Sequence, residues 1–307
     1  MLSIKEWKKI TGRLALKMEK EFSLEETLIL VNSLLFIKSI RTKQLSSLFS
    51  MIFMLMEDAA KAAKSMKQQP EKKICLVDAD VFIYQVGFAS EEVSEKSARA
   101  RLVEWFTDIV YINCKADDYK AYITGKTNYR NEVAVTVPYK GNRKDMKKPK
   151  HYDYLRDVLV KRLGAEMTNG IEADDAVAIA SAQDPSAIIV HVDKDLDQLP
   201  GKHYNPNKDL HYEVSDIEGL RNFYKQMLVG DRTDNIEGVP KIGPVKAGKW
   251  LDNKQTEQEM LKQVWELYQQ AGMSQERLIE NGQLLWLQRT PGQMWLPPFP
   301  LQDANGK

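Results

Sequence analysis

Cysteine and histidine are scarce in this chain of 307 residues. It has two cysteines, Cys75 and Cys114, far apart in sequence. This excludes a disulfide scaffold and a cysteine-rich zinc site, and it suits a reducing cytoplasm, where we expect the protein to reside. The four histidines show no HxxxH spacing; they are His151, His191, His203 and His211. The composition therefore predicts that any metal site is built from oxygen ligands.

The chain also lacks a dominant charge and a long apolar run. Its formal net charge is +1, so partners must be inferred from how charge is distributed. No signal peptide is evident. The apolar runs 27–37 and 48–56 are shorter than the roughly 20 residues that span a bilayer. We interpret them as two packed helices and expect no membrane span; a membrane-surface hairpin is the alternative.

The character of the chain changes after a polar linker, residues 61–73. Residues 1–70 look helical and carry no recognisable chemistry, whereas short β-rich runs alternate with helical segments from residue 74 onward. This alternation is typical of an α/β fold with a mostly parallel central sheet and helices on both faces. The predicted strands are 74–80, 118–125 and 186–195, and the predicted helices are 93–113, 151–164 and 173–183.

Four regions are expected along the chain. An N-terminal helical extension of unknown role covers 1–70, and the α/β core covers 74–215. A helical region follows at 216–290, in which the stretch 222–251 contains a Gly-Pro-rich turn between two helical patterns. Residues 291–307 form a tail.

Acidic residues gather where predicted strands end and predicted helices begin. Ligands of parallel α/β sheets bind beyond the carboxyl ends of the strands. Carboxylates crowded there repel one another, and two Mg²⁺ ions would neutralise them, clamp a phosphodiester and activate water. Taken singly, each cluster is also explained by helix capping or a turn. The clusters are Asp78/Asp80, Glu172/Asp174/Asp175, Asp193/Asp195 and Asp231/Asp234.

A basic segment, residues 138–152, lies between the first two acidic clusters, and tyrosines are interleaved with its charges. Basic groups neutralise phosphates and aromatic faces stack on unpaired bases, so an acidic centre beside this segment favours a metal-dependent nuclease. A solvated charge run is the alternative. The basic residues are Lys140, Arg143, Lys144, Lys147, Lys148 and Lys150, preceded by Arg130.

The stretch GVPKIGPVKA, residues 238–247, is a second candidate contact. Its two glycines, five positions apart, indicate a tight hairpin between helices, and free N–H groups at the start of the second helix can bind phosphate. An ordinary connection between helices is the alternative.

Six motifs occur in the order of a known family. On these motifs, over about residues 74–251, the chain resembles the phage and bacterial 5′→3′ exonucleases of the flap endonuclease superfamily, and most of all the stand-alone phage enzymes. The motifs are VDAD (77–80), YKGNR (139–143), EADD (172–175), VDKD (192–195), GDRTDN (230–235) and GVPKIGPVKA (238–247).

The resemblance implies a PIN-like nuclease core, a helical arch at about 126–165 and a helix-hairpin-helix motif with a K⁺ ion. It implies a 5′→3′ exonuclease or flap endonuclease that hydrolyses DNA from 5′ ends with two Mg²⁺ ions, for which Mn²⁺ substitutes. The implied substrates are duplexes with a 5′ end, flap or nick, and RNA–DNA hybrids if the enzyme removes primers in phage replication. Replication proteins are further expected partners.

The resemblance also implies roles for individual residues. Asp78, Asp193, Lys140 and Arg143 would be catalytic, and Tyr139 would stack on the terminal nucleotide. The implied metal ligands are Asp78, Asp80, Glu172, Asp174, Asp175, Asp193, Asp195, Asp231 and Asp234. The implied DNA contacts are Arg130, Tyr139, Lys140, Arg143, Lys144, Lys147, Lys148, Gly238, Val239, Lys241, Gly243 and Lys246.

One acid of the family pattern is missing. Many members have an aspartate at the end of the strand before the arch, where this chain has Thr124 and Gly125. We expect Asp80 to compensate, because it follows Asp78 by two residues. Two other functions stay open: a structure-specific DNA-binding protein without catalysis, and a PIN-type ribonuclease, against which the glycine hairpin argues.

Overall fold

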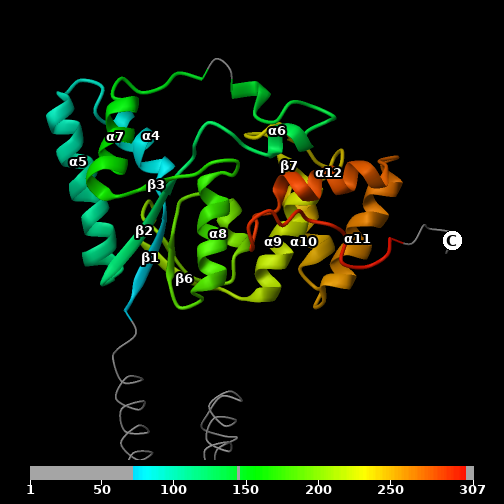
Figure 1. Cartoon of the computed structure of the whole chain (residues 1–307). Helices are drawn as coiled ribbons and strands as arrows, with labels where there is room; N and C mark the ends of the chain where they lie inside the picture. The colour runs from blue at the N-terminus through cyan, green and yellow to red at the C-terminus, as the bar shows by residue number, and fades with distance from the viewer. Residues whose placement is uncertain (1–71, 144–145, 302–307) are drawn as a thin grey trace, which may run out of the picture. The chain divides into compact units, whose positions relative to one another are not determined.

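The computed structural model describes residues 72–143 and 146–301 (Figure 1). Its centre is a six-stranded sheet in the order β3-β2-β1-β4-β5-β6, in which only β6 runs antiparallel to its neighbour. Helices cover both faces, so the predicted fold class is confirmed. The expectations for 1–70, Lys144 and the end of the tail lie outside the described residues. The predicted division into regions stays a prediction.

Three of the six strands coincide with the predicted ones: β1, β2 and β4. The hairpin β5–β6 and the two-residue β3 were not predicted. Their sequences are short and polar, and the hairpin strand β6 is largely exposed, so no apolar alternation marks them. The strands are β1 (Ile74–Asp78), β2 (Asp118–Ile123), β3 (Glu166–Met167), β4 (Ile188–Val190), β5 (Gly201–Asn205) and β6 (Leu210–Val214).

The predicted helices 93–113, 151–164 and 173–183 correspond to α5 with η2, α7 and α8. The π-helical η2 continues α5 without a break. The helical elements are α4 (Asp80–Phe88), α5 (Glu95–Thr107), η2 (Asp108–Asn113), α6 (Arg130–Val133), η3 (Gly141–Arg143), α7 (Tyr152–Leu163), α8 (Ala173–Gln183), η4 (Lys194–Gln198), α9 (Asp216–Val229), α10 (Pro244–Leu251), α11 (Glu257–Gln270) and α12 (Gln275–Leu285).

Alternating side chains of β1 bury the two faces of the sheet. Cys75 and Val77 pack with α4, α5 and α7, whereas Leu76 packs on the other face with α8. Phe82 of α4 and Phe106 of α5 contribute aromatic rings to the first core, with their centroids 5.3 Å apart. The carboxyl edge of the sheet is thereby held between two packed layers.

The helices α9 to α12 build a separate hydrophobic core, to which Phe223, Val264 and Leu278 contribute. A two-stranded ribbon, β7 (Gly230–Asp231) with β8 (Ile236–Glu237), follows α9 and leads to α10. The predicted pair of helices within 222–251 is therefore α9 and α10.

The segment predicted as a helical arch, 126–165, is helical only in part. Besides α7, it contains the single turn α6 and the 3₁₀ turn η3, and the stretch 134–140 has no helix. Figure 1 shows this segment crossing from the α6 region to α7 along the top of the view. No helix among the described residues is both long and apolar enough to span a bilayer.

Candidate metal centre and nucleic-acid interface

Two adjacent parallel strands deliver the first acids. The strand β1 ends at Asp78, and β4, paired with it through Val77 and Val190, leads to Asp193. Because parallel strands end at the same edge of a sheet, the two carboxylates approach each other there. Burial, followed by the charges of Asp80 and Asp193, raises the pKa of Asp78 well above its ordinary value.

Asp80 lies at the end of the neighbouring strand β2. Its two carboxylate oxygens accept hydrogen bonds from the Thr124 N–H, at 3.2 and 3.1 Å. Burial raises the pKa of Asp80, and the bonds from Thr124 oppose that rise. The side chain therefore brings a carboxylate to the strand end where the family pattern has an acid and this chain has Thr124 and Gly125.

The helix α8 supplies the next acids. Glu172 caps its N-terminus and accepts hydrogen bonds from the Tyr139 hydroxyl, at 2.7 Å, and from the Lys140 ammonium. Burial favours the protonated form of Glu172, but the charges of Lys140 and Arg130 outweigh it and lower its pKa. At Asp174, burial and the adjacent carboxylate raise the pKa well above its ordinary value.

The strand β7 and the turn after it supply two further acids, Asp231 and Asp234. Asp231 is buried and lies 3.3 Å from the Lys194 ammonium, which lowers its pKa despite burial. Asp234 accepts hydrogen bonds from Tyr139, at 2.6 Å, and from Arg143. Burial and the charge of neighbouring Asp193 raise the pKa of Asp195 to about 8.

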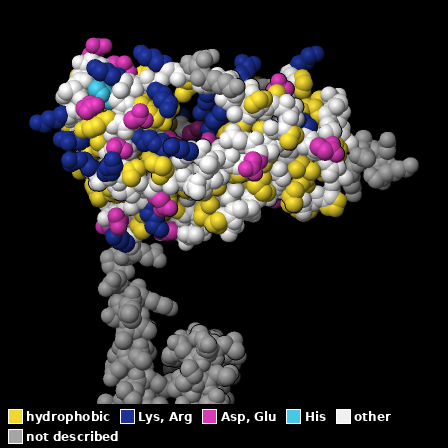
Figure 2. All heavy atoms as spheres, turned by 45° about the horizontal axis from the view of Figure 1, so that its top comes forward, with side chains coloured by type: hydrophobic (Ala, Val, Ile, Leu, Met, Phe, Trp, Pro, Cys, Tyr) yellow, Lys and Arg dark blue, Asp and Glu magenta, His cyan; other side chains and the backbone are white. Residues whose placement is uncertain are grey.

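The charges of these residues act on one another, so they form one cluster, which we call the acidic pocket: Asp78, Asp80, Glu172, Asp174, Asp193, Asp195, Asp231 and Asp234. Figure 2 shows acidic side chains inside a hollow with lysine and arginine side chains around it. No three of these carboxylates have oxygens within 4.8 Å of one another in the described part of the chain. Burial first, and the neighbouring carboxylates second, raise the pKa values of Asp78, Asp174 and Asp195, so a cation among them would be favourable. An all-oxygen donor set with surplus negative charge fits hard divalent cations such as Mg²⁺.

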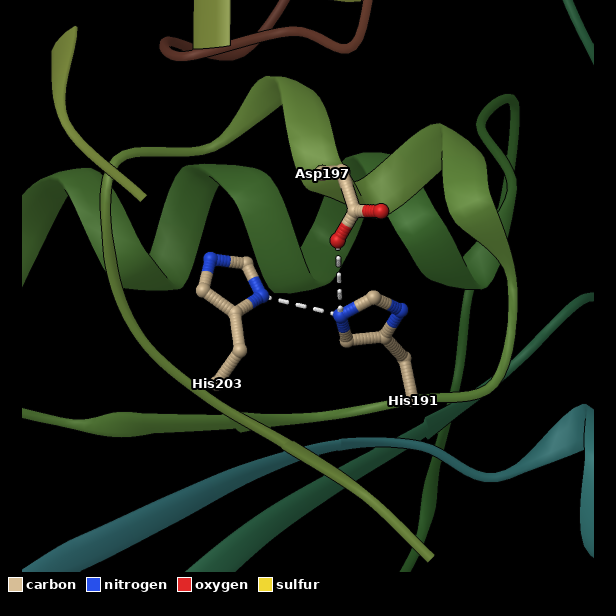
Figure 3. Close-up of side chains that lie close together, drawn as sticks. All are labelled: His191, Asp197 and His203. Atoms are coloured by element: carbon tan, nitrogen blue, oxygen red, sulfur yellow. Dashed lines mark hydrogen bonds and ion pairs between the residues drawn. The ribbon is translucent and has the colours of Figure 1, made fainter. Parts of the chain in front are cut away.

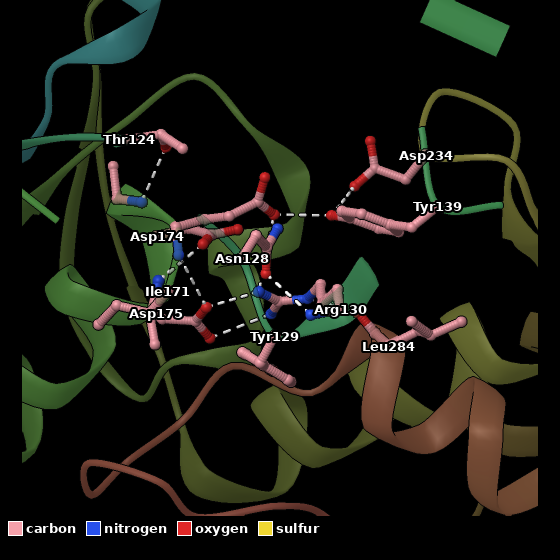
Figure 4. Close-up of polar contacts among 12 residues, drawn as sticks. Thr124, Asn128, Tyr129, Arg130, Tyr139, Ile171, Asp174, Asp175, Asp234 and Leu284 are labelled. Carbon is pink, nitrogen blue, oxygen red and sulfur yellow. Dashed lines mark hydrogen bonds and ion pairs between the residues drawn. The ribbon is translucent and has the colours of Figure 1, made fainter. Parts of the chain in front are cut away.

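Asp175 and Arg130 pair with each other in the interior, which bears on their predicted roles (Figure 4). The Arg130 guanidinium donates to both oxygens of Asp175, at 2.5 and 3.0 Å, and to the carbonyls of Leu284 and Trp286. Asp175 has no solvent exposure and Arg130 has 2%. Asp175 is therefore occupied rather than free to bind a metal ion, and Arg130 is not available to a DNA phosphate.

Tyr139 is also directed toward the acidic pocket. Its side chain is 8% exposed, and its hydroxyl donates toward Glu172 and Asp234 (Figure 4). A ring buried in this way offers no free face to a terminal base. Tyr139 instead bridges an acid from α8 and an acid from the β7 turn.

The basic residues of 138–152 divide into two groups. Lys140 and Arg143 turn inward and pair with Glu172 and Asp234 in the acidic pocket. Lys147 and Lys148 are exposed, and the Lys148 ammonium lies 4.3 Å from the centre of the Tyr152 ring. The exposed pair is positioned to meet a polyanion, and its DNA contact stays a prediction.

The stretch 238–247 forms a turn that enters α10. A Cβ at Gly238 would collide with the backbone of Val229 and Gly230, whereas one at Gly243, the residue before the helix, would meet nothing within 4 Å. Lys241 and Lys246 are exposed. The side chain of Val239 is buried and its N–H donates to the Leu228 carbonyl at 2.8 Å, and its DNA contact stays a prediction.

Some residues of the acidic pocket escaped the sequence analysis. Lys194 pairs with Asp231, and Gln226 of α9 donates to Asp195. Lys194 lies within the VDKD motif and could have been found there, whereas no pattern marks Gln226. His191 and His203, set aside for their spacing, are brought together by adjacent strands.

The fold and the acidic pocket define an α/β protein that gathers carboxylates at the carboxyl edge of a mostly parallel sheet. No family profile matches the chain. The chain is 27% identical over 224 residues to the DNA polymerase I of Bacillus caldotenax, which covers 64% of this chain and 25% of that protein. It is 27% identical over 211 residues to a 5′-3′ exonuclease of Buchnera aphidicola, covering 60% of this chain and 71% of that protein.

A solved structure shares the fold. The T5 5′-exonuclease with zinc bound superposes with a TM-score of 0.56 at 18% identity, over 70% of this chain and 89% of that one. The chain is therefore similar in sequence to a DNA polymerase I and to a 5′-3′ exonuclease, and it shares its fold with the T5 5′-exonuclease. The chain thus spans about a quarter of the polymerase and most of the stand-alone exonuclease that it matches.

Proposed function

We propose that the chain is a 5′→3′ exonuclease and flap endonuclease that hydrolyses phosphodiester bonds of DNA. The observation that carries the proposal is the meeting of the acidic pocket with the basic segment: Lys140 and Arg143 pair with Glu172 and Asp234. Metal ligands and phosphate-binding cations then stand side by side, as hydrolysis of a polyanion requires. The relatives named as 5′-3′ exonuclease and DNA polymerase I support the same reaction.

The acidic pocket would hold two Mg²⁺ ions, with Mn²⁺ as a substitute. Asp78, Glu172, Asp174 and Asp193 would serve one ion, and Asp195, Asp231 and Asp234 the other. Asp80 would supply the carboxylate missing at Thr124, whereas Asp175 is left out because Arg130 occupies it. When bound, the ions supply Lewis-acid activation of the phosphate and of water.

Lys140 and Arg143 perform the chain's own part of the reaction. The Lys140 N–H donates to the Asp234 carbonyl at 2.9 Å, and the residue has a φ of +52°, so the turn holds both cations at the pocket. In the complex, the substrate phosphate would pair with Lys140 and Arg143, and the bound metal would pair with Glu172 and Asp234, their present partners. The two side chains would then stabilise the charge that develops on the phosphate in the transition state.

Duplex DNA would be held outside the acidic pocket. The exposed Lys241 lies in the turn before α10, and the exposed Lys246 lies in the first turn of α10. The free N–H groups at the start of α10 would suit a phosphate. K⁺ would bind at the turn before α10. Lys147 and Lys148 would contact the strand that enters the pocket. Primer removal from RNA–DNA hybrids in phage replication, with replication proteins as partners, is the biological setting that we propose.

The test is an assay of duplexes labelled at the 5′ or the 3′ end, with Mg²⁺ and then with EDTA. We expect Mg²⁺-dependent release of the 5′ label. Asp193→Asn should abolish cleavage and retain DNA binding, whereas Asp157→Asn, an exposed acid of α7, should behave as the parent protein. Release from 3′ ends only, or cleavage in EDTA, would refute the proposal.

A DNA-binding protein without catalysis is the second candidate. Thr124 at the strand end and the internal pairs of Glu172 and Asp234 are the observations that favour it. It predicts binding to flapped DNA with no turnover in Mg²⁺ or Mn²⁺. The same assay separates the two, and matched RNA flaps would reveal a PIN-type ribonuclease.

A further inference from the structure

Two buried histidines face each other beside the acidic pocket. His191 follows β4 and His203 lies in β5, and each is 1% exposed. Nε2 of His191 and Nδ1 of His203 are 2.8 Å apart, and the two rings meet edge to face (Figure 3). The proposed nuclease activity makes no use of either residue.

The other nitrogen of each ring fixes its protonation. Nδ1 of His191 lies 2.5 Å from the Asp193 carbonyl, and Nε2 of His203 lies 2.9 Å from the Leu199 carbonyl. A carbonyl oxygen only accepts hydrogen bonds, so both of these nitrogens must carry the proton. A neutral imidazole has one N–H. The two nitrogens that face each other therefore both present lone pairs, which repel unless a cation lies with them.

A carboxylate and a hydroxyl complete the cluster. Asp197 Oδ1 is 3.8 Å from His191 Nε2, and the ligand atoms of the two histidines and Asp197 all lie within 4.8 Å of one another (Figure 3). The Tyr212 hydroxyl donates to Asp197 at 2.6 Å and lies 3.2 Å from His191 Nε2. Histidines that ligate metals characteristically donate their second N–H to a carbonyl or carboxylate, as both do here.

We propose that His191, His203 and Asp197 form a structural site for one Zn²⁺ ion, separate from the acidic pocket. Two imidazoles and a carboxylate are ligands that Zn²⁺ accepts and Mg²⁺ does not favour. Water or Tyr212 would take the fourth position.

The fit needs small movements. Zn–N bonds of about 2.05 Å in a tetrahedral arrangement separate two nitrogens by about 3.3 Å. The histidine rings must therefore part by about 0.5 Å, and Asp197 must approach by a similar amount, within the range of a side-chain rotation. A proton shared between the rings is the competing explanation, at the cost of a charged imidazolium in a buried place.

The site would fix the loop that carries two proposed catalytic acids. His191 and Asp197 stand on either side of Asp193 and Asp195, and the His191 ring bonds to the Asp193 carbonyl itself. A zinc ion there would hold η4 against β5 and so set where Asp193 and Asp195 enter the acidic pocket. Its role would be structural, because no substrate reaches the buried rings.

The test uses the full chain stripped with EDTA and then saturated with Mg²⁺ to fill the acidic pocket. Zn²⁺ is titrated against a chromophoric chelator, and bound zinc is measured by elemental analysis after gel filtration. We expect one zinc per chain, retained in excess Mg²⁺, and visible absorption bands of tetrahedral coordination when Co²⁺ replaces it. His203→Gln should lose the ion, and Asp197→Asn should bind it at least about 10-fold more weakly.

His211→Gln is the matched control, because His211 is exposed on the adjacent strand β6, and it should bind zinc as the parent chain does. If His203→Gln does not fold, Asp197→Asn decides, since that side chain is 32% exposed. The proposal would be overturned if the chain retained no zinc, or if His203→Gln and Asp197→Asn retained as much zinc as the parent chain. It would also be overturned if Mg²⁺ displaced the zinc and Asp193→Asn abolished its binding. The last outcome would assign the ion to the acidic pocket.

Discussion

Arg130 and Asp175 form a bidentate ion pair in the interior, with N–O distances of 2.5 and 3.0 Å. The pair joins α6 to the start of α8, and Arg130 also binds the carbonyls of Leu284 and Trp286 at the end of α12. One guanidinium therefore connects α6, the start of α8 and the end of α12.

Replacing this arginine should destabilise the fold. Arg130→Met leaves the Asp175 carboxylate buried without a counter-charge, and we expect a loss of about 3–5 kcal/mol in the free energy of unfolding. Urea unfolding followed by circular dichroism measures it. Lys147→Ala, at an exposed site, should stay within about 0.5 kcal/mol. A loss below about 1 kcal/mol for Arg130→Met would contradict the role given to this pair.

The metal-free protein should become less stable as pH rises. Asp78, Asp174 and Asp195 have a higher pKa in the folded chain than unfolded, so they contribute stability below about pH 4 that is lost as pH rises through their folded pKa, to about 8 for Asp195. Urea midpoints in EDTA should therefore fall between about pH 5 and 8. Mg²⁺ should raise the midpoint more at the upper end. A midpoint in EDTA that rises over this window would contradict the assignment.

Lys140 should affect turnover more than binding. Lys140→Met removes a cation that we place on the scissile phosphate, and we expect kcat to fall by about 10²- to 10³-fold with a small change in KM. Single-turnover cleavage of a 5′ flap measures it. Lys161→Met, an exposed lysine of α7, is the control. Equal kcat for both variants would remove Lys140 from the catalytic set.

Two glycines of the turn before α10 should respond differently to replacement by alanine. Gly238→Ala forces the backbone of Val229 and Gly230 apart and should cost about 1–3 kcal/mol, with weaker duplex binding. Gly243→Ala meets open space and should leave thermal unfolding unchanged. Thermal melts and duplex binding of both proteins provide the comparison. Identical melting temperatures would show that the close approach at Gly238 is dispensable.

The exposed lysines should contribute to the salt dependence of DNA binding. The double change Lys147→Ala and Lys148→Ala should reduce the slope of log affinity against log salt by up to about 2, because each phosphate contact releases counterions. Fluorescence anisotropy at several salt concentrations measures the slope. Lys72→Ala, at the opposite end of β1 from Asp78, should leave it unchanged.

The elements with strong patterns were predictable. The apolar runs ending in Asp78 and Asp193 identified β1 and β4, and the small apolar residues after Glu172 identified α8. The hairpin β5–β6 was missed because its strands are rich in polar residues and show no apolar alternation. They form a strand pair because β5 pairs with β4 and β6 pairs with β5.

The residue types of Arg130 and Tyr139 did not reveal that their side chains are buried. Arg130 and Tyr139 lie near a basic run and looked like DNA contacts, yet tertiary packing turns both inward toward carboxylates. His191 and His203 are twelve positions apart, a spacing that suggests nothing until β4 and β5 pair. Pairwise contacts between distant segments are not encoded in any local pattern, and these are the residues that the sequence analysis misassigned or passed over.

The acidic pocket draws its members both from the sheet and from the ribbon that joins two helices of the C-terminal region. Asp78 and Asp193 follow strands of the sheet, whereas Asp231 and Asp234 belong to the ribbon that runs directly from α9 into the turn before α10. The turn before α10 is therefore linked through β7 and β8 to two of the eight carboxylates of the acidic pocket, Asp231 and Asp234. Binding of a duplex at that turn, as proposed above, would therefore bear directly on where these two acids lie.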